Sequence, residues 1–273
     1  MSSEVRFDPG LYRGTAGHYD RFRLPYPDAM ITDLVRRAAP SGRGRLLDLA
    51  CGTGQLAFPL RDWFADVWSV DAEPDMTETV RAKAKAVGAA HIRTVTSRVE
   101  ELRAEPGDFE LIVIGNAFHR LRRTVVAERA HAWLEPGGCL ALCWSTSPWA
   151  GPHDWQRALD GLLRRWRNAL DASGRVPAGW DRARRHDPDR EVLSRAGFEF
   201  GGRHDLSREH HWTIAELAGH IRSTSFLPPP VLTDHAAEFD AELTAELGRH
   251  TVDGRLTETV GFAYELARKP AAA

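Results

Sequence analysis

Short apolar runs alternate with helix-like segments between residues 45 and 144 of the chain. The runs are mostly continuous rather than alternating, as strands that are buried on both faces require. Strands are therefore predicted at 45–50 (RLLDLA), 66–71 (DVWSVD), 91–96 (HIRTVT), 109–115 (FELIVIG) and 139–144 (CLALCW). Helices are predicted between them, in QLAFPLRDWF, PDMTETVRAKAKAV and RTVVAERAHAWL, the last ending at EPGG. Repeated alternation of strand and helix predicts a parallel sheet with right-handed crossovers.

The flanking segments differ from this core. A helix is predicted near 28–39 and an amphipathic helix in DWQRALDGLLRRWRNAL. From residue 188 we expect a helix in DPDREVLSRAG, a strand near 198–204, helices near 213–223 and 235–248, and a last strand in TETVGFAYELAR. The expected fold is α/β: a doubly wound, mostly parallel, seven-stranded sheet with a helical cap from the N-terminal and C-terminal segments. The expected divisions are 1–44 (N-terminal lid and first helix), 45–150 (ligand-binding core), 151–187 (insertion) and 188–273 (end of the sheet and substrate-covering cap).

Composition narrows the function classes. The 273 residues include 36 Lys and Arg against 38 Asp and Glu, so overall charge gives no attraction to nucleic acid or to an anionic membrane. Cys51, Cys139 and Cys143 have neither a disulfide pattern nor the partner ligands of a zinc site, and no metal is expected. The chain has no signal-peptide core and no apolar run of membrane-spanning length. We therefore expect a soluble, cytoplasmic protein; the sequence leaves open a partner protein or a homo-oligomer.

The segment LACGTGQLA follows the first core strand and predicts a ligand site. Gly52 and Gly54 allow positive φ and a close approach of a ligand to the backbone. The next helix points its N-terminal N–H groups at the same place, at the carboxyl end of the sheet. Asp71 ends the second strand, where it can accept hydrogen bonds from both hydroxyls of a ribose. These residues predict an adenosine-type ligand.

Two adenosine cofactors compete for this site. Gly52, Gly54 and Ala57 fit the G-x-G-x-x-G/A pattern of NAD sites. Asp48 argues against NAD, because a carboxylate in the cleft would repel a pyrophosphate and attract an ammonium or a sulfonium-bearing amino acid. Asp48 and Asp71 together favour S-adenosyl-L-methionine. The structural alternative for Asp48 is a cap at the end of the strand.

Several longer segments resemble one family in order and spacing. LLDLACGTGQLA, VWSVDAEPDM, RTVTSRVEEL, ELIVIGNAFHRL and WLEPGGCLALCW resemble the motifs of class I S-adenosylmethionine-dependent methyltransferases, which have a Rossmann-like fold. The flanks YDRFRLPYP, LAGHIRSTSFL and VDGRLTETVGFAYELARK are similar to a branch that includes trans-aconitate-type small-molecule methyltransferases. The resemblance implies O- or N-methylation of a small molecule, such as a carboxylate-bearing metabolite of specialised biosynthesis.

The resemblance also implies cofactor-binding residues. On the methionine side they are Asp48, Ala50, Gly52, Gly54 and Asn116. On the ribose and adenine side they are Asp71, Ala72, Met76, Arg98 and Val99. Tyr19 and Arg23 belong to an N-terminal lid, where Arg23 could pair with the cofactor's carboxylate. The alternative for these two is ordinary helix surface.

Candidate catalytic residues follow the fourth strand. Methyl transfer is an in-line displacement that requires alignment and exclusion of water, and a protonated acceptor can also require a base. His119 lies where the methyl group is expected and titrates in the right range, although a carboxylate acceptor would need no base. Relatives in the branch usually read H-W-x-D here. Arg120 departs from that pattern and could bind a carboxylate, phosphate or sulfate, whereas Arg122 and Arg123 fit a solvated face better.

Substrate contacts are expected from Trp144, Trp149, His210, His211, Arg222 and Ser225. The tryptophans would form aromatic walls. Of the two adjacent histidines, which face opposite sides of an extended segment, one would enter the pocket. Two other functions stay open: a methyltransferase-fold enzyme that binds S-adenosylmethionine or S-adenosylhomocysteine but catalyses a cyclisation or internal displacement, and a non-catalytic S-adenosylmethionine-binding partner protein.

Overall fold

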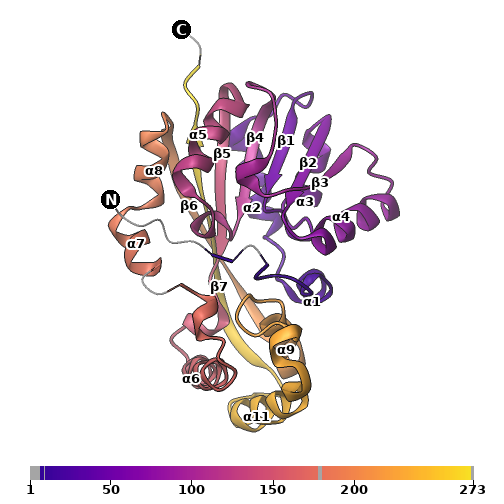
Figure 1. Cartoon of the computed structure of the whole chain (residues 1–273), viewed down its shortest axis with the longest axis vertical. Helices are drawn as coiled ribbons and strands as arrows, with labels where there is room; N and C mark the ends of the chain where they lie inside the picture. Colours follow the sequence, from indigo (N-terminus) through magenta and orange to yellow (C-terminus); the bar gives the residue numbers. More distant parts are fainter. Residues whose placement is uncertain (1–6, 9, 178–179, 272–273) are drawn as a thin grey trace.

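A computed structural model describes residues 7–8, 10–177 and 180–271 of the chain. A seven-stranded sheet with the order β3-β2-β1-β4-β5-β7-β6 forms its centre (Figure 1). The strands are β1 (Arg45–Leu49), β2 (Asp66–Asp71), β3 (Ile92–Thr96), β4 (Phe109–Gly115), β5 (Leu134–Ser145), β6 (Glu199–Trp212) and β7 (Leu256–Arg268). Strands β1 to β5 pair in parallel, and β7 is antiparallel to both of its neighbours. This topology confirms the predicted doubly wound, mostly parallel sheet.

Helices cover both faces of the sheet, as the continuous apolar strands require. In β4, Leu111 and Val113 belong to one core, and Ile112 and Ile114 to the other, because side chains alternate across a strand. The first core packs under α2 (Asp28–Ala38), α3 (Ala57–Leu60) and α4 (Pro74–Ala86). The second packs under α5 (Arg123–Trp133) and α8 (Asp189–Arg195).

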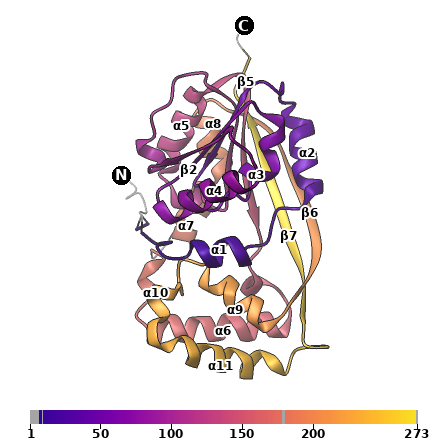
Figure 2. The ribbon, with the colours of Figure 1, turned by 90° about the vertical axis from the view of Figure 1, so that its right-hand side faces the viewer.

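A third group of helices forms a cap beyond the carboxyl ends of the strands (Figures 1 and 2). It contains α6 (Asp154–Ala169), α9 (Ile214–Arg222), α10 (Pro229–Leu232) and α11 (Ala236–Gly248), which share an apolar core. Helix α1 (Ala16–Phe22) lies between this cap and the sheet (Figure 2) and packs on α9. Helix α7 (Trp180–His186) precedes α8. Nowhere in the described part of the chain does a helix combine the length and apolarity that a bilayer crossing requires.

The β6–β7 hairpin joins the sheet to the cap. Strand β5 pairs with β7 only from Phe262 onward, so the first half of β7 pairs with β6 alone. There Glu258, 3% exposed, accepts hydrogen bonds from Trp212 Nε1 (2.6 Å) and Gln156 Nε2 (2.8 Å). The hairpin thereby fixes the position of α6 relative to the sheet.

Three element boundaries differ from the prediction. Strand β6 continues to Trp212 although its second half is polar, because pairing with β7 stabilises it along its whole length. Strand β5 begins at Leu134 and contains the predicted EPGG stop, where a Cβ on Gly138 would lie 3.0 Å from the Glu135 carbonyl oxygen. The helix expected in QLAFPLRDWF is only α3, followed by a 3₁₀ turn at Arg61–Trp63.

Candidate cofactor and substrate site

Strained backbone marks the carboxyl ends of the two central strands. Ala50 after β1 and Asn116 after β4 are non-glycine residues with φ of 53° and 52°. Such conformations are costly and concentrate at functional sites. They flank the point where the strand order reverses, which is where doubly wound sheets bind ligands. Gly52 has φ 55°, and a Cβ there would lie 3.0 Å from the Tyr19 ring, so only glycine fits both conditions.

Three cavities meet at this edge. We name them by position: the loop cavity, about 30 Å³, beside the glycine loop; the strand-end cavity, about 140 Å³, beside the ends of β2 and β3; and the cap cavity, about 900 Å³, between the sheet and the cap. Tyr19 and Asn116 line all three. The three spaces therefore adjoin around these two residues.

The strand-end cavity gathers most of the residues predicted for an adenosine ligand: Tyr19, Ala50, Gly52, Asp71, Ala72, Met76, Arg98, Val99 and Asn116. Asp71 accepts hydrogen bonds from the backbone N–H groups of Gly52 (2.9 Å) and Glu73 (3.0 Å), which ties the glycine loop to the start of α4. Burial raises the pKa of Asp71. Gly54 lies outside the cavity linings; a Cβ there would meet the Phe58 ring at 2.7 Å, so this glycine serves the turn and its packing.

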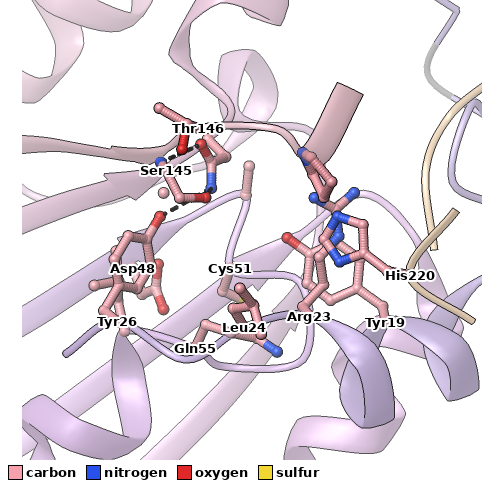
Figure 3. Close-up of a pocket in the computed structure, with 15 residues that line it drawn as sticks. Tyr19, Arg23, Leu24, Tyr26, Asp48, Cys51, Gln55, Ser145, Thr146 and His220 are labelled. Atoms are coloured by element: carbon pink, nitrogen blue, oxygen red, sulfur yellow. Dashed lines mark hydrogen bonds between the residues drawn. The ribbon is translucent and has the colours of Figure 1, made fainter. Parts of the chain in front are cut away.

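Asp48 lines the loop cavity with Tyr19 and Arg23 (Figure 3). It is 1% exposed and accepts a hydrogen bond from the Ala57 N–H at 2.9 Å, the contact expected of a structural cap. Burial raises the pKa of Asp48 to about 8, partly offset by that hydrogen bond. The side chain thus caps α3 and also lines a cavity, where a bound cation would favour its ionised form.

Arg23 and Tyr19 close the loop cavity from the side of α1. The Arg23 guanidinium lies 4.8 Å from the centre of the Tyr19 ring, and its Nη2 donates to the Ser223 carbonyl at 3.1 Å. The buried Nε of Arg23 has no hydrogen-bond partner among the described residues. Burial raises the pKa of Tyr19 to about 12, so its phenol is neutral. Both residues line the cavities rather than forming outer helix surface.

His119 is positioned differently from the expectation. Arg120 Nε donates to His119 Nε2 at 3.1 Å, so the lone pair needed by a base is engaged. Burial and the Arg120 charge lower the pKa of His119 to about 3. Arg120 itself lies over the rings of Phe7 (5.5 Å) and Tyr12 (5.0 Å) and lines both the strand-end and cap cavities. This geometry favours a positioning role for His119 over the predicted base.

His220, which sequence reasoning did not single out, supplies a better-placed nitrogen. Its Nδ1 lies 3.1 Å from the Phe22 carbonyl oxygen, which can only accept, so Nδ1 carries the proton and Nε2 is the bare nitrogen. His220 lines the loop cavity (Figure 3) and also the cap cavity. Burial and the Arg23 charge lower its pKa to about 3, which keeps the imidazole neutral. No local motif marks it, because Phe22 and His220 are distant in sequence.

The predicted substrate residues separate into two groups. Trp144, Trp149 and Ser225 line the cap cavity. His210, His211 and Arg222 line none of the three cavities. Both histidines lie on the extended strand β6, outside the cavities. His210 packs edge-on against Trp212, and His211 Nδ1 lies 2.9 Å from Thr257 Oγ1. Arg222 points to α11 and pairs with Asp240 at 2.7 Å. The assignment of these three to substrate binding is therefore not supported by their positions.

Neither a metal-ion cluster nor a disulfide lies among the described residues. Within the described ranges no group of three or more His, Cys, Asp or Glu residues could hold a metal ion. Cys51, Cys139 and Cys143 are buried and unpaired thiols. Burial raises the pKa of all three, so none is a reactive thiolate at neutral pH.

One known protein family matches the strand-and-loop core of the chain. Residues 46–138, the segment that holds β1 to β4 and the glycine loop, match a family model described as a methyltransferase domain. This segment is therefore similar to a methyltransferase domain. S-adenosyl-L-methionine is the cofactor of such domains, and the residues of the loop and strand-end cavities fit it: the buried carboxyl of Asp48, the carboxyl of Asp71 at the end of β2, and glycine backbone at Gly52, where a Cβ would clash.

Known proteins resemble the chain over different shares of its length. An uncharacterized methyltransferase of Mycobacterium tuberculosis, Rv3342, is 31% identical over 142 residues, 52% of this chain and 55% of the relative. The chain thus spans about half the length of that curated relative. A solved structure of a candidate type II methyltransferase from Anaeromyxobacter dehalogenans has a TM-score of 0.62 at 17% identity, covering 91% of this chain and 98% of its own. The [4+2]-cyclase SpnF has a TM-score of 0.53 at 18% identity, covering 92% and 84%.

Proposed function

We propose that this protein transfers the methyl group of S-adenosylmethionine to an oxygen or nitrogen of an acidic small molecule held in the cap cavity. The observation that supports it most is the junction of cavities. The strand-end cavity, which suits the nucleoside, and the cap cavity share Tyr19, Asn116 and Arg120. A donor on one side and an acceptor on the other would meet at that wall, as in-line transfer requires.

The chain's own residues would divide the binding of the donor. Asp71 would accept from the ribose hydroxyls. Asp48 lies at the loop cavity, where it would favour the ammonium group, and Arg23 offers a free Nε to the carboxylate. When bound, S-adenosylmethionine supplies an electrophilic methyl group and a neutral thioether leaving group.

Other residues would position the acceptor. Asn116 is fixed by three hydrogen bonds: Nδ2 donates to Tyr26 Oη (3.2 Å) and Ser145 Oγ (3.3 Å), and Oδ1 accepts from the Ser145 N–H (3.1 Å). A rigid wall at the junction restricts the acceptor's approach and displaces water. For a protonated acceptor, His220 Nε2 would accept a hydrogen bond from it and so help to orient it, whereas its low pKa makes it a weak base; a carboxylate acceptor would need no base.

The cap favours a small acceptor over a nucleic acid, because the helices α1, α6 and α9 cover the carboxyl edge of the sheet (Figure 2). The cap cavity is lined by arginines from several elements, including Arg23, Arg120, Arg167, Arg184 and Arg203, against the acids Asp189 and Glu265. This excess of positive charge supports a substrate with a carboxylate or similar group.

The test uses S-adenosylmethionine with a deuterated methyl group. The purified chain is incubated with a metabolite extract of its host, and products are read by mass spectrometry. Methyl transfer predicts a species heavier by the labelled methyl together with an equal amount of S-adenosylhomocysteine. An Asp71→Ala variant serves as the control that lacks the ribose acceptor.

A second function has one observation in its favour. The chain shares its fold with a [4+2]-cyclase, although at 18% identity this shows the fold alone. A converted metabolite without label, and with S-adenosylmethionine intact, would replace methyl transfer by cyclisation or internal displacement. The His119–Arg120 pair does not help that alternative, because the histidine's lone pair is already engaged.

A further inference from the structure

Four residues that line the cap cavity carry buried polar atoms that lack protein partners. Arg23 Nε, Arg120 Nη1, Arg167 Nε and Ser225 Oγ are buried and have no hydrogen-bond partner among the described residues. All four residues line the cap cavity. Buried donors are normally paired, because an unmade hydrogen bond forfeits the group's solvation. Three guanidinium N–H groups and a hydroxyl without partners, all on residues that line one cavity, indicate a ligand with acceptor oxygens.

Two of these groups lie apart from the cofactor residues. Arg23 and Arg120 also line the loop or strand-end cavity, whereas Arg167 and Ser225 line the cap cavity alone. Arg167 comes from α6, and Ser225 follows α9. A ligand group held by this pair would therefore occupy the part of the cavity that belongs to the cap.

Arg167 and Ser225 lie among packed and hydrogen-bonded neighbours. Ser225 is fully buried, and its carbonyl oxygen accepts from Arg175 Nε at 2.6 Å. The Arg167 guanidinium lies 5.6 Å from the centre of the Phe226 ring, which in turn packs edge-on against Trp149 at 5.0 Å. Cationic and hydroxyl donors beside an apolar wall suit an anionic group attached to an apolar body.

The acids that line the cavity are already paired with other arginines. Asp189 binds Arg184 and Arg123, both at 2.8 Å, and Glu265 lies 3.9 Å from Arg203. Neither is available to neutralise Arg167. The cap end of the cavity therefore keeps a positive charge, which would attract an anion.

We propose that Arg167 and Ser225 form an anchor subsite for a carboxylate or phosphate of the acceptor molecule, distinct from the atom that is methylated. The inference rests on the proposed methyl transfer and adds to it the place where the anionic group of the substrate is held. With the anion held at the cap end, the body of the substrate packs against Phe226 and Trp149. The acceptor atom then lies toward Asn116 and His220, where the cap and loop cavities adjoin.

The experiment measures binding to the full chain saturated with S-adenosylhomocysteine, by calorimetry at constant ionic strength. The probes are 3-phenylpropionate, phenyl phosphate and the uncharged 3-phenylpropan-1-ol. A charge-assisted hydrogen bond predicts that at least one acid binds about tenfold or more tightly than the alcohol. Arg167→Met should remove that preference, and Ser225→Ala should reduce it several-fold.

Arg164→Met is the matched control. Arg164 lies on the same helix, but its side chain is 67% exposed and pairs with Asp160. It should leave the preference for the acid unchanged. If both arginine variants lose the preference for the acid equally, the effect comes from overall charge, and the subsite is refuted. A wild type that binds acid and alcohol equally well would also refute it.

Two further readouts separate the possible failures. The S-adenosylhomocysteine affinity of Arg167→Met should equal that of wild type, and Ser225→Ala tests the subsite independently if Arg167→Met fails to fold. A wild type without affinity for S-adenosylhomocysteine would refute the proposed function, whatever the acids do. Normal affinity without acid discrimination would refute the anchor alone.

Discussion

Asp48→Asn tests the buried carboxyl beside the glycine loop. The asparagine keeps the shape and an acceptor oxygen for the Ala57 N–H, which Asp48 binds at 2.9 Å. It removes the ability to ionise. Burial raises the pKa of Asp48 from 3.8 to about 8, so the ligand-free wild type resists ionisation of this group. The substitution therefore isolates the cost of a buried charge from the loss of a cap.

The direction of the pH effect on stability follows from the linkage between proton binding and folding. An acid with a raised folded-state pKa contributes stability that is fully present below its unfolded pKa and is lost as pH rises through the folded value. Each pH unit between the two values is worth about 1.4 kcal/mol. Between pH 6 and pH 9 the ligand-free wild type should thus lose about 2–3 kcal/mol of stability relative to Asp48→Asn.

The assay is urea denaturation of both proteins at pH 6, 7, 8 and 9, with the difference in unfolding free energy plotted against pH. Using the difference cancels every other titrating group. Bound S-adenosylmethionine should reverse the order, because its ammonium stabilises the ionised carboxylate of wild type and has no counterpart in the variant. A difference that stays flat from pH 6 to 9 would show that Asp48 ionises normally and would refute the reasoning.

Three further predictions concern Asp71, Gly52 and Glu258. Asp71→Ala should weaken S-adenosylhomocysteine binding by about 1–3 kcal/mol in calorimetry, the cost of stranded hydroxyl groups, and unchanged affinity would remove Asp71 from the site. Gly52→Ala should destabilise the fold by about 1–2 kcal/mol in thermal denaturation, because φ is 55° and a Cβ would press on Tyr19; a neutral effect would mean that the loop readily relaxes. Glu258→Leu should lower the unfolding free energy by about 2–4 kcal/mol, since the donors of Trp212 and Gln156 lose their acceptor, and a stable variant would show that the cap does not depend on this link.

The amino-acid sequence was sufficient to predict the parallel core and the glycine loop at its carboxyl edge. Apolar runs such as 109–115 specify strands because both faces must be buried, and the glycine loop is specified by local backbone freedom at Gly52. Asp71 could be predicted for the same reason: it ends a strand whose partner carries the loop. These features depend on residues close together in the chain.

Which side chains lie together depends on contacts between distant segments. The second half of β6 is polar and becomes a strand through pairing with β7, which moves His210 and His211 away from the cavity. His220 has a bare Nε2 because the carbonyl oxygen of Phe22, 198 residues earlier, accepts a hydrogen bond from its Nδ1–H. Arg167 and Ser225 meet in one cavity from separate parts of the cap. Burial, tautomer and hydrogen-bond partner are set by contacts between distant segments, and no local pattern of residues encodes them.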